Sequence, residues 1–270
     1  MLISLPKIIG IVNITEDSFS DGGLYLDPEK AISYALKLID DGAFAVDLGP
    51  ASSHPDAKPV SPEEEIRRLS PVMDALQQQH TRLSVDSFRP ETQLYAMRKG
   101  VDFLNDIEGF ARPELYPQIA EARCNLIVMH SVQRRGIATR VESEPATILD
   151  QISFFFEERL NALQMAGVKR ERFIVDPGMG FFLGRNPEPS VKVLQSISQL
   201  KLRFDLPVLI SVSRKSFLRN ITGRAVPEIE AATLTAEIYA SLQEVDYIRT
   251  HNVKSLFDAT RVLAALTKSV

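Results

Sequence analysis

The sequence lacks several features that would otherwise restrict its chemistry. Among its 270 residues there is one cysteine, Cys124, and no tryptophan. One cysteine cannot form a disulfide within the chain, and a single thiol does not make a metal site. Because free cysteine is among the most buried residue types, Cys124 is predicted to be a buried structural thiol.

Long hydrophobic runs and targeting signals are also lacking. No stretch approaches the roughly 18 apolar residues that a helix needs to span a bilayer. The first ten residues have neither the basic segment nor the small-residue cleavage site of a secretion signal. These absences predict a cytoplasmic protein that makes no membrane contact.

An excess of positive charge is the third absence. The chain has 31 Lys and Arg against 35 Asp and Glu, a formal net charge of -4. Nucleic acid is therefore not expected as a partner, because a phosphate backbone calls for a basic face. A local basic pocket for a small anion stays compatible with this balance.

What the sequence does contain is a regular alternation of short apolar runs and amphipathic segments. The runs are apolar without strict alternation, which is typical of parallel strands buried on both faces. Helix signals lie between them, such as Pro28 in a first turn and Ser61 with Glu64 as a capping box. Strands are predicted at residues 8–12, 45–48, 82–86, 103–106, 126–130, 173–176, 208–212 and 247–250. Helices are predicted at 28–40, 62–76, 90–99, 113–122, 147–166, 190–203, 229–243 and 255–267.

Eight strands, each followed by a helix, predict an α/β fold of one domain over residues 1–270. The count favours a closed (β/α)₈ TIM barrel, and an open doubly wound sheet is the structural alternative. No long linker, internal repeat or low-complexity tract interrupts the pattern. In a barrel the loops after the strands lie at the C-terminal face, so the active site is expected there.

Polar residues stand at the end of nearly every predicted strand, where they would converge on one mouth. Carboxylates and amides suit the edge of a flat nitrogen heterocycle, since a carboxylate can accept two N–H donors at once. Cations and imidazoles suit an anion, and an amide oxygen suits a hard cation beside a diphosphate. The residues are Asn13, Asp47, Asp86, Asn105, Asp106, His130, Asp176, Ser213, Lys215, Arg249 and His251, with His54 in the loop after the second strand.

Residues 176–184 read Asp-Pro-Gly-Met-Gly-Phe-Phe-Leu-Gly. Phe181 and Phe182 stand beside glycines after a strand and are expected to be exposed. Exposed paired phenylalanines usually have a ligand or a lid that covers them. Residues 17–23 form a second polar, glycine-containing loop near the same mouth.

The chain resembles the dihydropteroate synthases over nearly its full length. The first signature is Asn-Ile-Thr-Glu-Asp-Ser-Phe-Ser-Asp-Gly-Gly at 13–23, and Asp-Leu-Gly at 47–49 with Ser-His-Pro at 53–55 forms the second. Val-Asp-Ser at 85–87, Asn-Asp-Ile at 105–107 and Met-His at 129–130 follow. Asp-Pro-Gly at 176–178, Ser-Arg-Lys-Ser at 213–216 and Arg-Thr-His at 249–251 complete the ordered set.

The resemblance implies a role for each matched position. Asp86, Asn105, Asp176 and Lys215 would bind the pterin ring, and Asn13 would bind Mg²⁺ beside the diphosphate. The diphosphate itself would contact Ser53, His54, Arg249 and His251. The p-aminobenzoate pocket would comprise Ser53, Pro55, Phe181, Phe182, Ser213 and Lys215. Loops 14–25 and 50–60 would close over the substrates, and the last helices would form a homodimer.

The implied reaction joins 6-hydroxymethyl-7,8-dihydropterin diphosphate to p-aminobenzoate, giving 7,8-dihydropteroate and diphosphate. Mg²⁺ and cationic residues would stabilise the departing diphosphate. The aniline nitrogen would then attack a carbocation-like methylene. No protein nucleophile is needed, and none with a base partner is evident.

Three positions depart from the family pattern. Glu16 replaces a usual proline, and His54, which is titratable near neutral pH, replaces a usual arginine. The loop after the sixth strand has two more residues than usual, around Phe181 and Phe182. This loop resembles that of the sulfonamide-resistant, plasmid-borne branch of the family. One of these phenylalanines is predicted to exclude the bulky substituent of a sulfonamide while leaving room for a carboxylate.

Two other functions stay open at this level. A pterin-binding methyltransferase domain shares the barrel and the ring contacts, but has no use for residues 17–23 or a diphosphate site. A catalytically inactive pterin-binding paralogue would be expected to have lost Asn13, Lys215 or the Arg249–His251 pair, which are all present.

Overall fold

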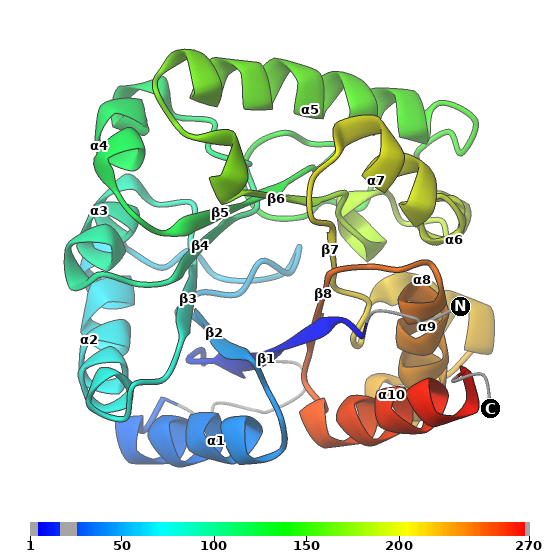
Figure 1. The fold of residues 1–270 in the computed structure, drawn as a ribbon, viewed down its shortest axis with the longest axis horizontal. Coiled ribbons are helices and arrows are strands. Elements are labelled where there is room, and N and C mark those ends of the chain that lie inside the picture. The colour runs from blue at the N-terminus through cyan, green and yellow to red at the C-terminus, as the bar shows by residue number, and fades with distance from the viewer. Residues whose placement is uncertain (1–4, 17–25, 268–270) are drawn as a thin grey trace.

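The computed structural model describes residues 5–16 and 26–267, which form one barrel of eight parallel strands ringed by helices (Figure 1). The strands are hydrogen-bonded in the order β6-β5-β4-β3-β2-β1-β8-β7. A parallel bridge between Val175 and Val208 joins β6 to β7 and closes the ring. The strands are β1 (Lys7–Asn13), β2 (Ala45–Gly49), β3 (Leu83–Asp86), β4 (Phe103–Asp106), β5 (Asn125–Met129), β6 (Phe173–Asp176), β7 (Leu209–Ile210) and β8 (Tyr247–Thr250).

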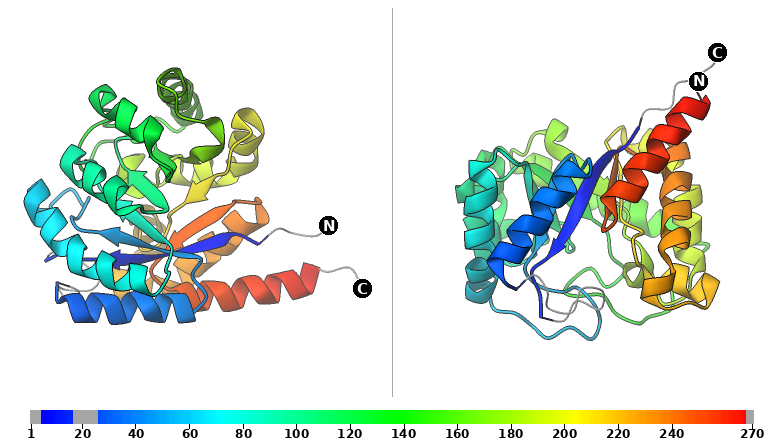
Figure 2. Two further views of the ribbon diagram at one scale, coloured as in Figure 1. Left: turned by 60° about the vertical axis from the view of Figure 1, so that its left-hand side comes forward. Right: turned by 90° about the horizontal axis from the view of Figure 1, so that it is seen from below.

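The helices form an outer layer around the strands in both views of Figure 2. The α-helices are α1 (Pro28–Asp40), α2 (Pro62–Gln78), α3 (Pro90–Lys99), α4 (Tyr116–Glu121), α5 (Ile148–Met165), α6 (Glu188–Gln195), α7 (Ile197–Phe204), α8 (Ser216–Thr222), α9 (Glu230–Leu242) and α10 (Val253–Thr267). Short 3₁₀ turns lie at η1 (Pro113–Leu115), η2 (Arg170–Arg172), η3 (Gly180–Phe182) and η4 (Val226–Glu228). The predicted TIM barrel is confirmed.

Several helices differ from the sequence-based prediction. The helix predicted at 190–203 is two helices, because the backbone leaves helical geometry at Ser196 (φ -116°, ψ 11°). The helix predicted at 113–122 begins as the 3₁₀ turn η1. Helix α8 is absent from the prediction; it follows β7 closely and ends at Gly223, whose φ of 66° favours glycine.

The predicted capping box at α2 is half formed. Ser61 Oγ accepts a hydrogen bond from the Glu64 N–H at 3.3 Å. The Glu64 carboxylate, however, accepts from Arg67 and Arg68 one turn further along α2. The return bond of a capping box is therefore replaced by three charge-assisted bonds, two from Arg67 and one from Arg68.

The barrel interior is apolar at one end and polar at the other. Phe44, Phe103 and Tyr247 lie edge to face at centroid distances of 6.3–6.4 Å at the N-terminal end of the strands. Ile9, Ile127 and other buried residues fill the layer beside them. A larger apolar layer, which includes Cys124 as predicted, lies between strands and helices. The polar side chains of the barrel interior therefore lie at its C-terminal mouth.

No helix within 5–16 and 26–267 is long and apolar enough to cross a membrane.

Candidate active site

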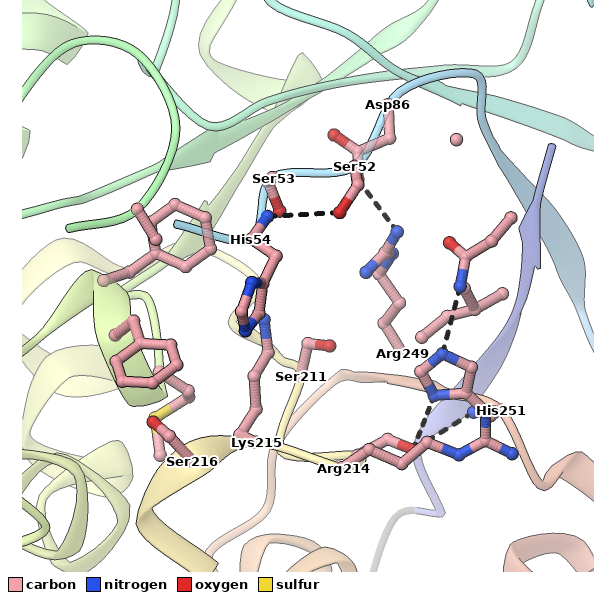
Figure 3. Close-up of a pocket in the computed structure, with 18 of the residues that line it drawn as sticks. Ser52, Ser53, His54, Asp86, Ser211, Arg214, Lys215, Ser216, Arg249 and His251 are labelled. Carbon is pink, nitrogen blue, oxygen red and sulfur yellow. Dashed lines mark hydrogen bonds and ion pairs between the residues drawn. The ribbon is translucent and has the colours of Figure 1, made fainter. Parts of the chain in front are cut away.

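The mouth of the barrel holds two adjoining compartments, one deep and one open. The deep compartment, here called the inner compartment, is lined by Ser53, Asp86, Asn105, Ile107, Met129, Asp176, Met179, Phe182, Ser211, Lys215 and Arg249. The open one, the outer compartment, adds Asn13, His54, Pro55, Phe181, Ser213, Ser216, Arg219 and His251 among others. Asp86, Lys215 and Arg249 are among the residues that line both compartments, and all three are labelled in Figure 3.

The four residues expected to bind a ring come together in the inner compartment. Asn105 and Asp176 are buried, at 3% and 4% exposure. Asp176 Oδ1 accepts from the Gly178 N–H at 2.8 Å, which fixes the carboxylate. Asp86, Asn105, Asp176 and Lys215 therefore present acceptors and one cation to a single small space.

Arg249 is held by two carboxylates. Its Nε donates to Asp47 Oδ2 and its Nη2 donates to Asp86 Oδ2, the latter at 2.8 Å. Asn105 Nδ2 also donates to Asp47 Oδ2, at 3.3 Å. This cluster makes Asp47 a support of the inner compartment. The predicted phosphate contact of Arg249 stays a prediction, since two of its nitrogens already face carboxylates.

Burial moves the ionisation of this cluster toward neutral pH. It raises the pKa of Asp86 to about 7 and that of Asp176 to about 6, against the opposing charges of Arg249 and Lys215. Burial also lowers the pKa of Lys215 to about 8, assisted by the charge of Arg249. These three groups titrate close to physiological pH, as is typical of functional sites.

Burial disfavours the charged form of both histidines at the mouth. Burial lowers the pKa of His251 well below 6.5, and it lowers that of His54 too. Asn13 Nδ2 lies 3.3 Å from His251 Nε2, and Ser213 Oγ lies 2.9 Å from His251 Nδ1. Since Asn13 Nδ2 can only donate, Nε2 accepts and the Nδ1–H donates to Ser213.

The residues near Asn13 fit a Mg²⁺ ion that is bound mainly by its substrate. Within 5–16 and 26–267 no group of three or more His, Cys, Asp or Glu side chains could hold a metal. His251 holds the amide nitrogen of Asn13, which leaves the amide oxygen as one protein ligand. Mg²⁺ commonly takes one or two protein oxygens and completes its shell with phosphates and water.

The two phenylalanines are not an exposed pair as predicted. Phe182 is 4% exposed and packs with Ile107, Met129 and Ala138, because η3 folds onto the loop after β5. The Val132 N–H donates to the Phe182 carbonyl at 2.9 Å and fixes this position. Phe181 is half-buried at the rim, 5.8 Å from the His54 ring. Both line the outer compartment, together with the predicted Ser53, Pro55, Ser213 and Lys215.

Two strand-end residues turn away from the mouth. Asp106 accepts from Gln93 Nε2 at 2.8 Å and from the Phe110 N–H at 3.0 Å, on the helix side of β4. His130 is buried, with Nδ1 3.1 Å from the Pro177 carbonyl. The prediction that every strand-end residue meets at one mouth is wrong for these two.

Arg219, a cation of the outer compartment, carries no signal in the sequence. It lies in α8, a helix that the sequence pattern does not predict. Residues 17–25 of the predicted closing loop lie outside the described residues.

Comparison with known proteins accounts for this arrangement. Residues 9–251 match the family model of the pterin binding enzymes. The match reaches from β1 to β8 and includes every residue of the inner compartment. The fold and the site therefore define a barrel enzyme of the pterin-binding class.

Comparison with individual relatives shows which family of this class the chain belongs to. The type-3 and type-2 dihydropteroate synthases of Escherichia coli are each 55% identical to the chain over 262 residues, covering 97% of it and 100% and 96% of the relatives. A solved dihydropteroate synthase of Xanthomonas albilineans with 4-aminobenzoic acid superposes with a TM-score of 0.87 at 32% identity, covering 99% of this chain and 95% of that one. The chain belongs to the dihydropteroate synthases, and these relatives do not favour a methyltransferase domain.

Proposed function

We propose that the enzyme condenses 6-hydroxymethyl-7,8-dihydropterin diphosphate with p-aminobenzoate to 7,8-dihydropteroate and diphosphate. The main supporting observation is the convergence of Asp86, Asn105, Asp176 and Lys215 in one buried compartment that opens onto a second, cationic one. The C–O bond to the diphosphate breaks, a C–N bond forms to the aniline nitrogen, and that nitrogen loses a proton. No protein nucleophile takes part.

The inner compartment suits a pterin because its acceptors match the ring's N–H edge. Asp176 and Asp86 would accept from ring N–H groups, and Asn105 can both donate and accept. Lys215 would hold an acceptor atom of the ring while facing the outer compartment. Burial of the set strengthens each of these bonds, and the carboxylates would stabilise positive charge that develops on the ring methylene.

The outer compartment would hold the diphosphate and p-aminobenzoate side by side. Asn13 would hold Mg²⁺, which when bound neutralises charge on the leaving diphosphate. Ser53, His54, Arg249 and His251 are the proposed contacts of the diphosphate, and His251 would donate to a phosphate oxygen only by giving up its Nδ1–H bond to Ser213. Ser53, Pro55, Phe181, Phe182, Ser213 and Lys215 would surround p-aminobenzoate.

We also propose that the enzyme is insensitive to sulfonamides. Such drugs share the aniline half of p-aminobenzoate and carry a larger group in place of the carboxylate. Phe181 lies at the rim of the outer compartment against His54, on the side where that group would project. A rigid ring there would clash with the drug and leave the compact substrate unaffected.

The assignment of the inner compartment is tested by Asp176→Ala. Loss of a buried charged acceptor should lower kcat/KM for the pterin diphosphate by about 30-fold or more, since such a truncation costs at least about 2 kcal/mol. The matched control is Asp150→Ala on the exposed face of α5, which should leave kcat/KM unchanged. Near-normal turnover by folded Asp176→Ala would refute the assignment.

A further inference from the structure

Arg219 is a cation at the edge of the active site that has no hydrogen-bond or ion-pair partner in the described part of the chain. It lies in α8 and lines the outer compartment. Its Nε atom is buried without a hydrogen-bond partner among the described residues, and no carboxylate there pairs with it. Other arginines of the mouth face, such as Arg140 and Arg249, are paired with carboxylates. An unsatisfied buried N–H donor is costly, and a ligand that accepts from Arg219 Nε would remove this cost.

The surroundings of Arg219 point to a small planar anion. Its guanidinium carbon lies 6.0 Å from the centre of the Phe181 ring, in cation–π range. Ser216, one turn earlier in α8, has a buried Oγ that also lacks a hydrogen-bond partner within residues 5–16 and 26–267. Asp86 is the one acid among the described residues that line the compartment, and Arg249 already engages it. The end of the compartment near Arg219 therefore carries donors and positive charge that nothing in the described chain satisfies.

This end lies opposite Asn13 and His251. In Figure 3, Ser216 lies on one side of Lys215 and His251 lies on the other, with the His54 ring at the tip of Lys215. Arg219 follows Ser216 by one turn in α8 and contacts Phe181, which places it on the Ser216 side. Asn13 and His251 are bonded to each other on the far side. Arg219 is thus separated from Asn13, the proposed Mg²⁺ ligand, and from His251.

We infer that Arg219 binds the carboxylate of p-aminobenzoate and selects an anionic aniline as the second substrate. The inference rests on the proposed function. The aniline nitrogen must face the ring methylene near Lys215, and the carboxylate is para to it, so the carboxylate projects away from the inner compartment. A guanidinium can bind a carboxylate through two parallel N–H bonds, and Phe181 holds the guanidinium over its ring face.

The test compares p-aminobenzoate with its neutral isostere, 4-aminobenzamide, as second substrates for Arg219→Gln. The ratio of their kcat/KM values should fall about tenfold relative to the unaltered enzyme, because the lost bond acts on the anion alone. KM for the pterin diphosphate should stay within about twofold. Arg219→Lys, which keeps the charge, should retain most of the preference. The control is Arg224→Gln, since Arg224 is an exposed arginine nearby that pairs with Glu228.

An unchanged ratio in folded Arg219→Gln would overturn the inference while leaving the proposed function intact. A raised KM for the pterin diphosphate with an unchanged ratio would overturn it too, by assigning Arg219 to the diphosphate. If Arg219→Gln does not fold, an unchanged ratio in Arg219→Lys with a raised diphosphate KM would overturn the inference in the same way. Absence of product from the unaltered enzyme would instead refute the proposed function.

Discussion

At the scale of single residues, the site depends on charges that stabilise one another away from water. Arg249 bridges Asp47 and Asp86, and Lys215 faces Asp86 and Asp176. Each charge would be costly alone in this environment, so the cluster holds only as a set. A bound ring that donates N–H bonds to Asp86 and Asp176 would supply part of the stabilisation that Arg249 and Lys215 give these buried carboxylates.

These ionisations predict a bell-shaped pH profile for kcat/KM of the pterin diphosphate. Asp86 and Asp176 must both be carboxylates to accept from the ring, so activity should fall as pH drops through about 7, the pKa of Asp86, and further through about 6, the pKa of Asp176. Lys215 loses its charge as pH rises through its pKa of about 8, so activity should fall there as well. Lys215→Arg, which stays charged, should move the alkaline limb upward. A kcat/KM that stays constant as pH falls below and rises above these pKa values would contradict the assignment.

The residues of the inner compartment were predictable because strand ends converge in a barrel. Which of two adjacent residues faces inward was not, since a step of one residue reverses the side of a strand. Asn105 and Met129 face inward, whereas Asp106 and His130 face the helices. The pairing of Arg249 with Asp47 was also beyond prediction, because it joins strands that are far apart in the sequence.

At the scale of elements, the loop after β6 and helix α8 set the shape of the outer compartment. Gly180 has a φ of 64°, and a Cβ there would come within 3.1 Å of Ser216 Oγ and 3.2 Å of Lys215 Cβ. The glycine thus lets η3 lie directly against the start of α8. Sequence periodicity could not predict either element, because both are too short to show a helical period.

Phe181→Ala should make the enzyme sensitive to sulfamethoxazole. Removing the ring at the rim opens the space that the drug's substituent needs. The inhibition constant should fall by about 5-fold to 140-fold, as relief of a clash of about 1 to 3 kcal/mol implies. KM for p-aminobenzoate should change less than the inhibition constant. Phe154→Ala is the control, since Phe154 is exposed on α5. Equal inhibition constants for Phe181→Ala and the unaltered enzyme would show that Phe181 does not discriminate.

At the scale of the whole molecule, the barrel could be predicted from the sequence because eight strand and helix pairs can be counted in it. The aromatic layer of Phe44, Phe103 and Tyr247 closes one end, so the site can form only at the other. The break at Ser196 and the short β7 were not predictable, because both depend on how the chain packs after β6. Element identity was thus more predictable than element boundaries.

The outer surface supports a proposed homodimer through the last helices. Tyr239 and Leu242 on α9 and Val262 and Leu266 on α10 are 40–78% exposed, and the two helices pack side by side. Val262→Asp would place a charge in this surface. Sedimentation equilibrium should give a dimer for the unaltered chain and a monomer for the variant. A dimer that persists in Val262→Asp would exclude this surface as the interface.

The most direct test of the central claim is a product measurement on the purified enzyme. With the pterin diphosphate, p-aminobenzoate and Mg²⁺, mass spectrometry should detect 7,8-dihydropteroate and diphosphate in equal amounts. Omitting either substrate should abolish both, and chelating Mg²⁺ should slow their formation until the metal is restored. Absence of dihydropteroate from folded enzyme supplied with all three components would contradict the account.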